Sequence, residues 1–165
     1  KKGADRADIV VVTKCPDNIT LATTKEIRND LNLRPEQKIY FSQITYDQLI
    51  YGITEKLPLS YLENKNFTLV TGIANSDPLV DFLTKKQFDF NHQKFSDHHH
   101  FSNSEVHSLK GSNLILTTEK DFVRLQPRLQ NFPIYYLPIN STILLEQEAA
   151  FKKEISNSVA HFGLG

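Results

Sequence analysis

Short apolar runs alternate with amphipathic segments along most of this chain. Runs rich in β-branched and aromatic residues predict strands, and segments with apolar side chains three or four positions apart predict helices. The expected strands are residues 8–14, 38–44, 67–71 and 113–117, and the expected helices are residues 20–32, 77–86, 102–110, the segment after Thr118, and 146–161. This alternation predicts an α/β fold, a three-layer sandwich around a mainly parallel sheet.

The remaining segments have weaker patterns. Residues 45–66 carry apolar positions interrupted by a glycine and a proline, which favours a short ribbon or an irregular excursion. Residues 88–95 alternate and predict an edge strand, and residues 133–139 are expected to be the last strand. The first run, residues 8–14, does not alternate, so we expect it to be buried on both faces.

Several helix starts are marked by side chains that can accept backbone amide protons. The expected N-caps are Thr20, Asp77, Ser102 or Ser104, and Thr118. Pro78 suits the first turn of the second helix. In the helix after Thr118, Val123 and Leu125 are expected to face inward.

The composition fits one globular domain over residues 1–165. Hydrophobic residues make up 39% of the chain and charged residues 23%, which is ordinary for a globular protein. Lys+Arg and Asp+Glu both number 19, and this zero net charge does not suggest a nucleic-acid partner. No apolar run approaches the ~20 residues that span a bilayer. The lone Cys15 cannot form an internal disulfide and is interpreted as structural.

Features of the chain's opening indicate that part of the protein is elsewhere. Methionine is absent throughout, including position 1, and residues 1–6 have the character of a loop. The phosphate-binding pattern Gly-x-x-x-x-Gly-Lys-Ser/Thr is also missing. We therefore expect a piece of a longer protein, or a processed one, with part of its active site outside these residues.

Polar groups follow three predicted strands, at the sheet edge where α/β proteins form their sites. These groups are Thr13-Lys14, Thr71–Asn75 and Thr117–Asp121. Gly72 indicates either a backbone conformation closed to other residues or the close approach of a ligand or another domain, and its spacing favours the first. Lys120 and Arg124 share a helix face and could bind an anion, although a solvated face is the commoner outcome.

The run Asp97-His98-His99-His100 lies between two phenylalanines and has three interpretations. A metal site requires its ligands to converge within ~2.0–2.2 Å of one ion, and adjacent residues on an extended chain point in opposite directions. A carboxylate beside a histidine also suits acid–base chemistry. The third interpretation is a solvated loop without chemistry, which composition alone favours. Zinc-type ligand spacings are absent, so we predict no metal ligands.

Four segments together resemble a known family. They are 6-RADIVVVTKCP-16, 70-VTGIAN-75, 95-FSDHH-99 and 116-LTTEKDFVRL-125. In this order they resemble the C-terminal half of tetraacyldisaccharide 4′-kinase, the lipid A 4′-kinase of Gram-negative bacteria. Ser76 departs from the family, which usually has proline there.

The resemblance implies a two-lobed P-loop kinase of which this chain is the C-terminal lobe. Such an enzyme transfers the γ-phosphoryl group of ATP to the 4′-hydroxyl of tetraacyldisaccharide 1-phosphate at the cytoplasmic face of the inner membrane. The N-terminal lobe would supply the phosphate loop, the Mg²⁺ ligands, the catalytic aspartate and the membrane-associating segment. The implied partners are the lipid substrate, the N-terminal lobe and the membrane surface. Residues 1–165 alone are expected to be inactive.

The same resemblance assigns roles to particular residues. His98 matches the family histidine that partners the catalytic aspartate of the other lobe, and Asp97 would hold His98 in position. Gly72, Asn75, Thr118 and Lys120 are expected to face the nucleotide. His99 and His100 do not inherit the role of His98.

Two alternatives belong to other functional classes. Asp-His-His also occurs in metal-dependent phosphoesterases, which use further aspartates to bind two metal ions. Asp77 and Asp89 are the nearest candidates for such ligands. The second alternative is a non-catalytic α/β domain that binds a ligand or another protein.

Overall fold

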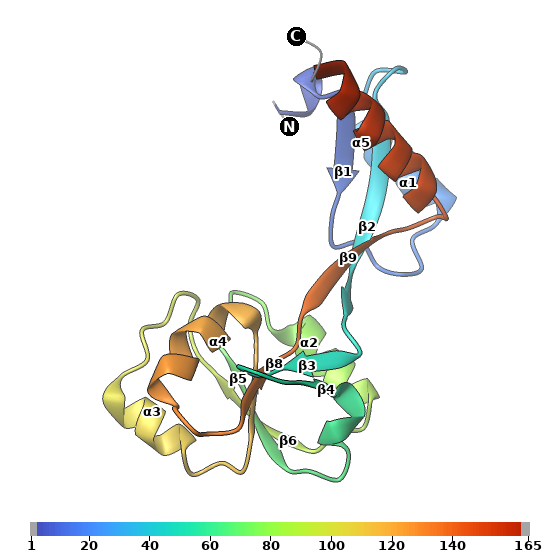
Figure 1. Ribbon diagram of the computed structural model, residues 1–165. Coiled ribbons are helices and arrows are strands. Elements are labelled where there is room, and N and C mark those ends of the chain that lie inside the picture. Colours follow the sequence, from blue (N-terminus) through green and yellow to red (C-terminus); the bar gives the residue numbers. More distant parts are fainter. Residues whose placement is uncertain (1–2, 163–165) are drawn as a thin grey trace. The chain divides into compact units, whose positions relative to one another are not determined.

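A computed structural model of the protein describes residues 3–162 (Figure 1). The chain forms two compact units. Unit 1 combines the chain up to Thr45 with the chain from Ile139, and unit 2 is Tyr46–Pro138. The expectation that residues 1–165 act as one domain, the C-terminal lobe, stays a prediction.

Unit 2 is built on a six-stranded sheet with the order β4-β3-β8-β7-β5-β6. Its strands are β3 (Leu49–Tyr51), β4 (Lys56–Pro58), β5 (Phe67–Thr71), β6 (Phe90–Lys94), β7 (Ile115–Thr117) and β8 (Ile134–Tyr136). Strands β8, β7, β5 and β6 run parallel, while β3 and β4 form an antiparallel ribbon at one side. The structure confirms the mostly parallel α/β sheet, the ribbon within 45–66 and the edge position of β6.

Helices cover both faces of this sheet (Figure 1). They are α2 (Asp77–Lys85), α3 (Asn103–Leu109) and α4 (Glu119–Leu125), with single turns η2 (Leu59–Leu62) and η3 (Gln126–Arg128). Because neighbouring strand residues point to opposite faces, Leu69 packs in a cluster with α2, and Val70 packs in a cluster with α3 and α4. In β7, Leu116 likewise packs in the cluster with α2, and Ile115 packs in the cluster with α3 and α4. This produces the three layers that the sequence predicts.

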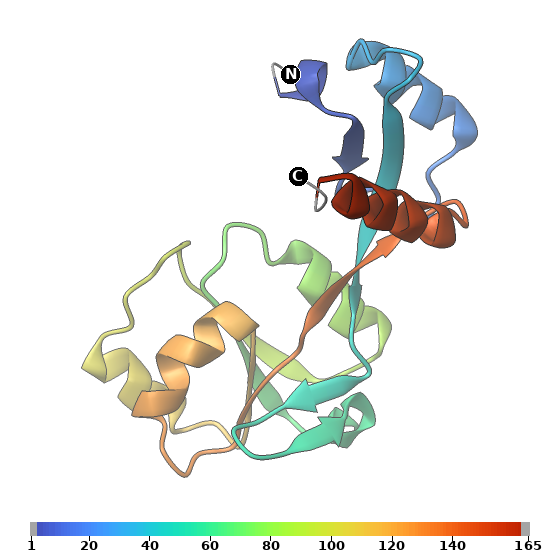
Figure 2. The same cartoon turned by 45° about the horizontal axis from the view of Figure 1, so that its top comes forward.

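Unit 1 contains a three-stranded sheet in the order β1-β2-β9. Its elements are η1 (Ala4–Arg6), β1 (Ile9–Val12), α1 (Leu21–Asp30), β2 (Lys38–Tyr46), β9 (Ile139–Ile143) and α5 (Glu148–Phe162). Figure 2 shows α1 and α5 on opposite faces of this sheet. Phe41 packs in a cluster with Ile27 of α1, and the adjacent Tyr40 ring lies 5.0 Å from the Phe151 ring of α5.

Two strand predictions that concern the sheet of unit 1 are wrong. Strand β1 is not buried on both faces, because it is the end strand of its sheet and the Val11 side chain is 38% exposed. The predicted last strand, residues 133–139, is followed by a further strand, β9. Its residues Asn140 and Ser141 are exposed, so the hydrophobic pattern gave no signal for it.

Most predicted helix caps are confirmed. The hydroxyl groups of Thr20, Ser102 and Thr118 each accept an amide proton from the first turn of the following helix. Asp77 is not the cap of α2, because Ser76 holds that position without a side-chain cap bond. The inward orientation of Leu125 is confirmed, whereas that of Val123 is wrong.

That error has a local cause. The side chain of Val123 is 68% exposed, while Leu125 is fully buried. Residues two positions apart on a helix differ by about 200° in direction, so they cannot share one buried face.

Among residues 3–162, no helix has both the length and the apolar character that crossing a bilayer requires.

Candidate functional site

The predicted histidine run forms a turn after β6, here called the His98 turn (residues 95–101). The amide of Phe95 donates to the carbonyl of Thr71 at 2.7 Å, which fixes the start of the turn beside the end of β5. The amide of His98 donates to Asp97 Oδ1 at 3.0 Å, and the φ angle of His98 is 60°. This left-handed conformation is uncommon for residues other than glycine. The hydrogen bonds of the Phe95 and His98 amides hold the chain in this turn.

The turn separates the neighbouring histidines. The His98 side chain is 74% exposed. The ring of His99 lies instead 4.8 Å from the ring of Phe95 and 5.2 Å from that of Phe101. His98 is therefore available for chemistry outside the turn, whereas His99 belongs to its aromatic interior.

Glu105 holds His99 from the other side. Its carboxylate oxygens lie 3.0 and 3.1 Å from His99 Nε2, and one of them accepts the Ser102 amide proton at 2.6 Å. The Ser102 hydrogen bond, followed by that of His99, lowers the pKa of Glu105 to about 2. The same carboxylate completes the capping box of α3. His99 thus has a structural role.

Asp97 is bound more closely to Lys120 than to His98. Lys120 Nζ lies 2.8 Å from Asp97 Oδ1, whereas His98 Nε2 lies 3.6 Å from Asp97 Oδ2. The hydrogen bond from Lys120 is the main cause that lowers the pKa of Asp97, with a smaller contribution from the charge of His98. The carboxylate therefore stays ionised and ties the turn to the first turn of α4.

The buried carboxylate of Asp121 connects α4 to the end of β5. Its Oδ2 accepts the Gly72 amide proton at 2.8 Å and the Thr118 hydroxyl proton at 2.7 Å. A Cβ atom at Gly72 would lie 2.9 Å from Asp121 Oδ1. Among the glycines of residues 3–162, none has a positive φ. The favoured explanation of Gly72, a special backbone conformation, is therefore wrong, and the close approach of Asp121 replaces it.

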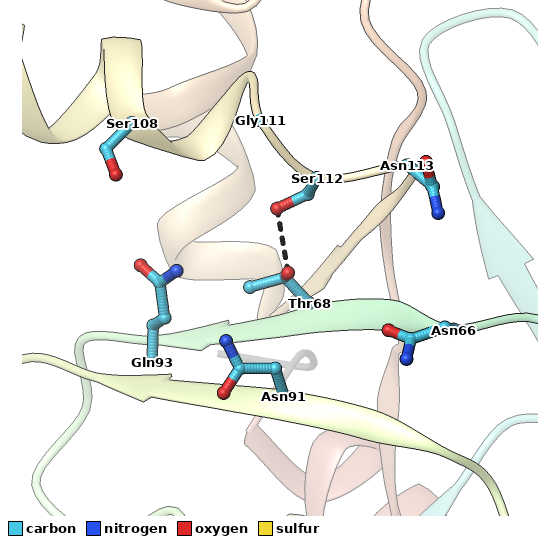
Figure 3. A pocket seen from close by; sticks show the side chains of 8 residues that line it. All are labelled: Asn66, Thr68, Asn91, Gln93, Ser108, Gly111, Ser112 and Asn113. Carbon is cyan, nitrogen blue, oxygen red and sulfur yellow. Dashed lines mark hydrogen bonds between the residues drawn. The ribbon is translucent and has the colours of Figure 1, made fainter.

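A separate pocket of about 340 Å³ lies near the start of β5, away from the His98 turn (Figure 3). Amides and hydroxyl groups dominate its wall, and Thr68 Oγ1 and Ser112 Oγ lie 2.7 Å apart within it. Its lining residues are Asn66, Thr68, Asn91, Gln93, Ser108, Gly111, Ser112 and Asn113. This set contains no charged side chain.

Comparison with known proteins decides the family. A sequence profile described as "Tetraacyldisaccharide-1-P 4'-kinase" matches residues 1–160. The chain belongs to this family. The resemblance seen in the four segments is thereby confirmed, and the match covers both units.

Curated members of the kinase family are similar over most of the chain. Tetraacyldisaccharide 4′-kinase of Flavobacterium johnsoniae is 40% identical over 151 residues, covering 90% of this chain and 44% of the relative. The corresponding protein of Bacteroides thetaiotaomicron is 38% identical over 177 residues, covering 93% and 46%. The chain therefore spans about half the length of these relatives, and it matches their C-terminal half.

A solved structure of the family shares the fold. The "apo" form of LpxK from Aquifex aeolicus, crystallised in complex with ATP, superposes with a TM-score of 0.54 at 18% identity. The match covers 90% of this chain and 51% of that chain. It supports the α/β architecture as that of the kinase family.

The residues predicted to face the nucleotide are brought together only in part. Gly72 and Thr118 meet at Asp121, and Lys120 of the same helix reaches Asp97. Asn75 lies exposed before α2, where its Oδ1 accepts the Asp77 amide proton at 3.0 Å. Their contact with a nucleotide stays a prediction.

The phosphoesterase and ligand-binding alternatives are not supported, because the matching relatives are kinases. Within the described residues, no three His, Cys, Asp or Glu side chains are grouped so that they could hold a metal ion. Asp77, one proposed metal ligand, instead has its Oδ1 3.5 Å from Lys94 Nζ.

Sequence reasoning missed Arg128 as a part of this site, and it included Asp121 only as one of the polar groups Thr117–Asp121 at the end of a predicted strand. The bond of Asp121 to Gly72 was not predicted, because nothing in the local sequence indicates a partner 49 residues away. Arg128 donates to the carbonyl of Phe101 and to Asn103 Oδ1. The one available signal was its spacing of four residues from Arg124, which repeats the spacing of Arg124 from Lys120.

Proposed function

We propose that this chain is the C-terminal part of an ATP-dependent kinase that phosphorylates the 4′-hydroxyl of tetraacyldisaccharide 1-phosphate in lipid A biosynthesis. The family match over residues 1–160 supports the reaction. One observation connects the reaction to this chain. The imidazole of His98 is exposed, and the backbone amide of the same residue is fixed by its hydrogen bond to Asp97.

His98 acts as the partner of a catalytic aspartate in the N-terminal lobe. The aspartate accepts the proton of the lipid hydroxyl as the phosphoryl group is transferred, and the imidazole orients the aspartate or shares this proton. Asp97 supports the turn by accepting the His98 amide proton. The hydrogen bond from Lys120 lowers the pKa of Asp97, which favours the charged carboxylate that accepts this amide proton.

ATP supplies the transferred phosphoryl group, and the N-terminal lobe holds most of the ATP and its Mg²⁺. The 165 residues contain no Gly-x-x-x-x-Gly-Lys-Ser/Thr loop, and the described residues contain no acidic cluster suited to a metal ion. The ends of β5 and β7 contribute Gly72, Asn75 and Thr118 to the nucleotide side of the site, whereas the ammonium group of Lys120 at the same edge is bound to Asp97. Gly72 and Thr118 do so through the loop geometry that Asp121 fixes, because their donor groups already bond to its carboxylate.

The N-terminal lobe is also the structural partner of this chain. The chain covers 44% of the relative from Flavobacterium johnsoniae, and the remaining part of such a protein would supply this lobe. The full-length enzyme acts at the cytoplasmic face of the inner membrane, where its lipid substrate is found. The neutral net charge does not favour nucleic acid as a partner.

A phosphorylation assay tests the proposal. The full-length protein should transfer ³²P from labelled ATP to tetraacyldisaccharide 1-phosphate in detergent micelles, while residues 1–165 alone should transfer none. The full-length protein with its phosphate-loop lysine replaced by methionine is the negative control. Turnover by residues 1–165 alone, or a full-length protein that leaves this lipid unmodified, would refute the proposal.

A further inference from the structure

Three basic residues spaced four apart contact successive points of the chain that contains His98. Lys120 binds the carboxylate of Asp97 at 2.8 Å, and Arg124 donates to the carbonyl of His99 at 3.2 Å. Arg128 donates to the carbonyl of Phe101, and its second nitrogen lies 2.6 Å from Asn103 Oδ1. We call Lys120, Arg124 and Arg128 the basic row.

The order of the basic row along the chain matches the order of its targets. Lys120 and Arg124 lie about one turn apart on α4, and Arg128 lies in η3, which directly follows α4. The three side chains therefore follow one another along this segment and contact the neighbouring chain in the same order. The observed targets are at positions 97, 99 and 101.

Helix α4, which carries Lys120 and Arg124, is fixed to the core, and Arg128 follows it in η3. Leu125 is fully buried against the sheet, and Asp121 joins α4 to Gly72 at the end of β5. Arg124 NH1 also lies 4.0 Å from Asp121 Oδ1, so the row and this anchor are in contact. A rigid support of this kind fixes the position of a catalytic group better than a free loop does.

We propose that the basic row is the positioning device of His98, setting where its imidazole stands relative to the reacting groups. Lys120 is the decisive member, because it binds the carboxylate oxygen that also accepts the His98 amide proton. Its ammonium group is occupied by Asp97, and it acts on catalysis through the turn rather than by contact with the nucleotide. This inference rests on the proposed role of His98.

Steady-state kinetics of the full-length kinase test the inference. Lys120→Met removes the charge but retains the chain length, and it should lower kcat about 10- to 100-fold, as small misplacements of catalytic groups do. The KM for ATP should change less than about twofold, because no substrate contact is lost. Lys120→Arg should restore most of the activity, and Lys110→Met, at an exposed lysine after α3, should behave as the wild type.

Two further measurements separate this inference from the proposed function. In a His98→Ala background, Lys120→Met should cause no additional loss, because the two residues act as one unit. Hydrogen exchange of residues 95–101 should accelerate in Lys120→Met and remain unchanged in Lys110→Met, whatever His98 does in catalysis. Three results for Lys120→Met would each overturn the inference. They are unchanged hydrogen exchange of residues 95–101, a higher KM for ATP with constant kcat, and a loss of kcat in the His98→Ala background equal to that in the wild type. Normal activity of His98→Ala, with accelerated exchange in Lys120→Met, would instead refute the role of His98.

Discussion

The carboxylate of Asp121 accepts the amide proton of Gly72 at 2.8 Å, across 49 residues of sequence. This bond joins the end of β5 to α4, and through Lys120 it is connected to the turn that exposes His98. The second carboxylate oxygen of Asp121 has no hydrogen-bond partner among the described residues. A side chain at position 72 would press against that oxygen.

Gly72→Ala should therefore destabilise the protein. The new Cβ atom would lie 2.9 Å from Asp121 Oδ1, and relieving this contact requires a shift of a fully buried side chain. We expect the free energy of unfolding to fall by about 1–3 kcal/mol, as for other overpacked sites, measured by urea denaturation. Gly3→Ala is the control, since nothing lies within 4 Å of its Cβ position. Equal stability of the two variants would contradict the explanation given for Gly72.

The Glu105 carboxylate should make stability depend on acidity. Its pKa falls from the ordinary 4.5 to about 2 in the folded protein, so the unfolded chain binds the proton more readily. The stabilisation is therefore present above pH 4.5 and is lost as the pH falls toward 2. Urea denaturation of the wild type and Glu105→Gln should show a stability difference that shrinks over this range.

The control for that experiment is Glu119→Gln, which removes an exposed carboxylate from the first turn of α4. Its difference from the wild type should vary much less with pH. A wild-type advantage over Glu105→Gln that persists undiminished at pH 2 would show that charge at Glu105 is not the source of the effect.

His98→Ala should reduce kcat of the full-length kinase by about 10²- to 10⁴-fold, the usual range for a lost acid–base partner. The KM for ATP should change little, because the imidazole acts on the aspartate rather than on the nucleotide. His100→Ala, also exposed in the same turn, provides the matched control and should retain activity. An unchanged kcat in His98→Ala would remove this residue from the mechanism.

Many of the strands and helices could be predicted from local sequence. Strand β5 was predicted at its observed residues, 67–71. A short apolar run bounded by polar residues is typical of a strand buried inside a sheet. The caps Thr20, Ser102 and Thr118 were found because a cap bond spans only three residues. The family was recognised for a related reason, since four local motifs in order are visible without knowing any contact.

The candidate site was predictable only in its residue types. Sequence indicated His98 and Asp97, and it placed Lys120 on a helix face with Arg124. It did not show that Lys120 binds Asp97, because that bond joins residues 23 positions apart. It also suggested the wrong reason for Gly72, whose constraint is a carboxylate rather than its own backbone angles.

The sequence by itself determined the alternating elements, the helix starts and the family, because these depend on side-chain periodicity, short-range hydrogen bonds and the order of motifs. The tertiary structure alone decided that polar β9 is a strand, that Val11 is exposed at a sheet end, and that the basic row follows the His98 turn. The physical reason is the same in each case. Pairing, burial and ion contacts between distant segments depend on which surfaces the folded chain brings together, and local propensity contains no information about that choice.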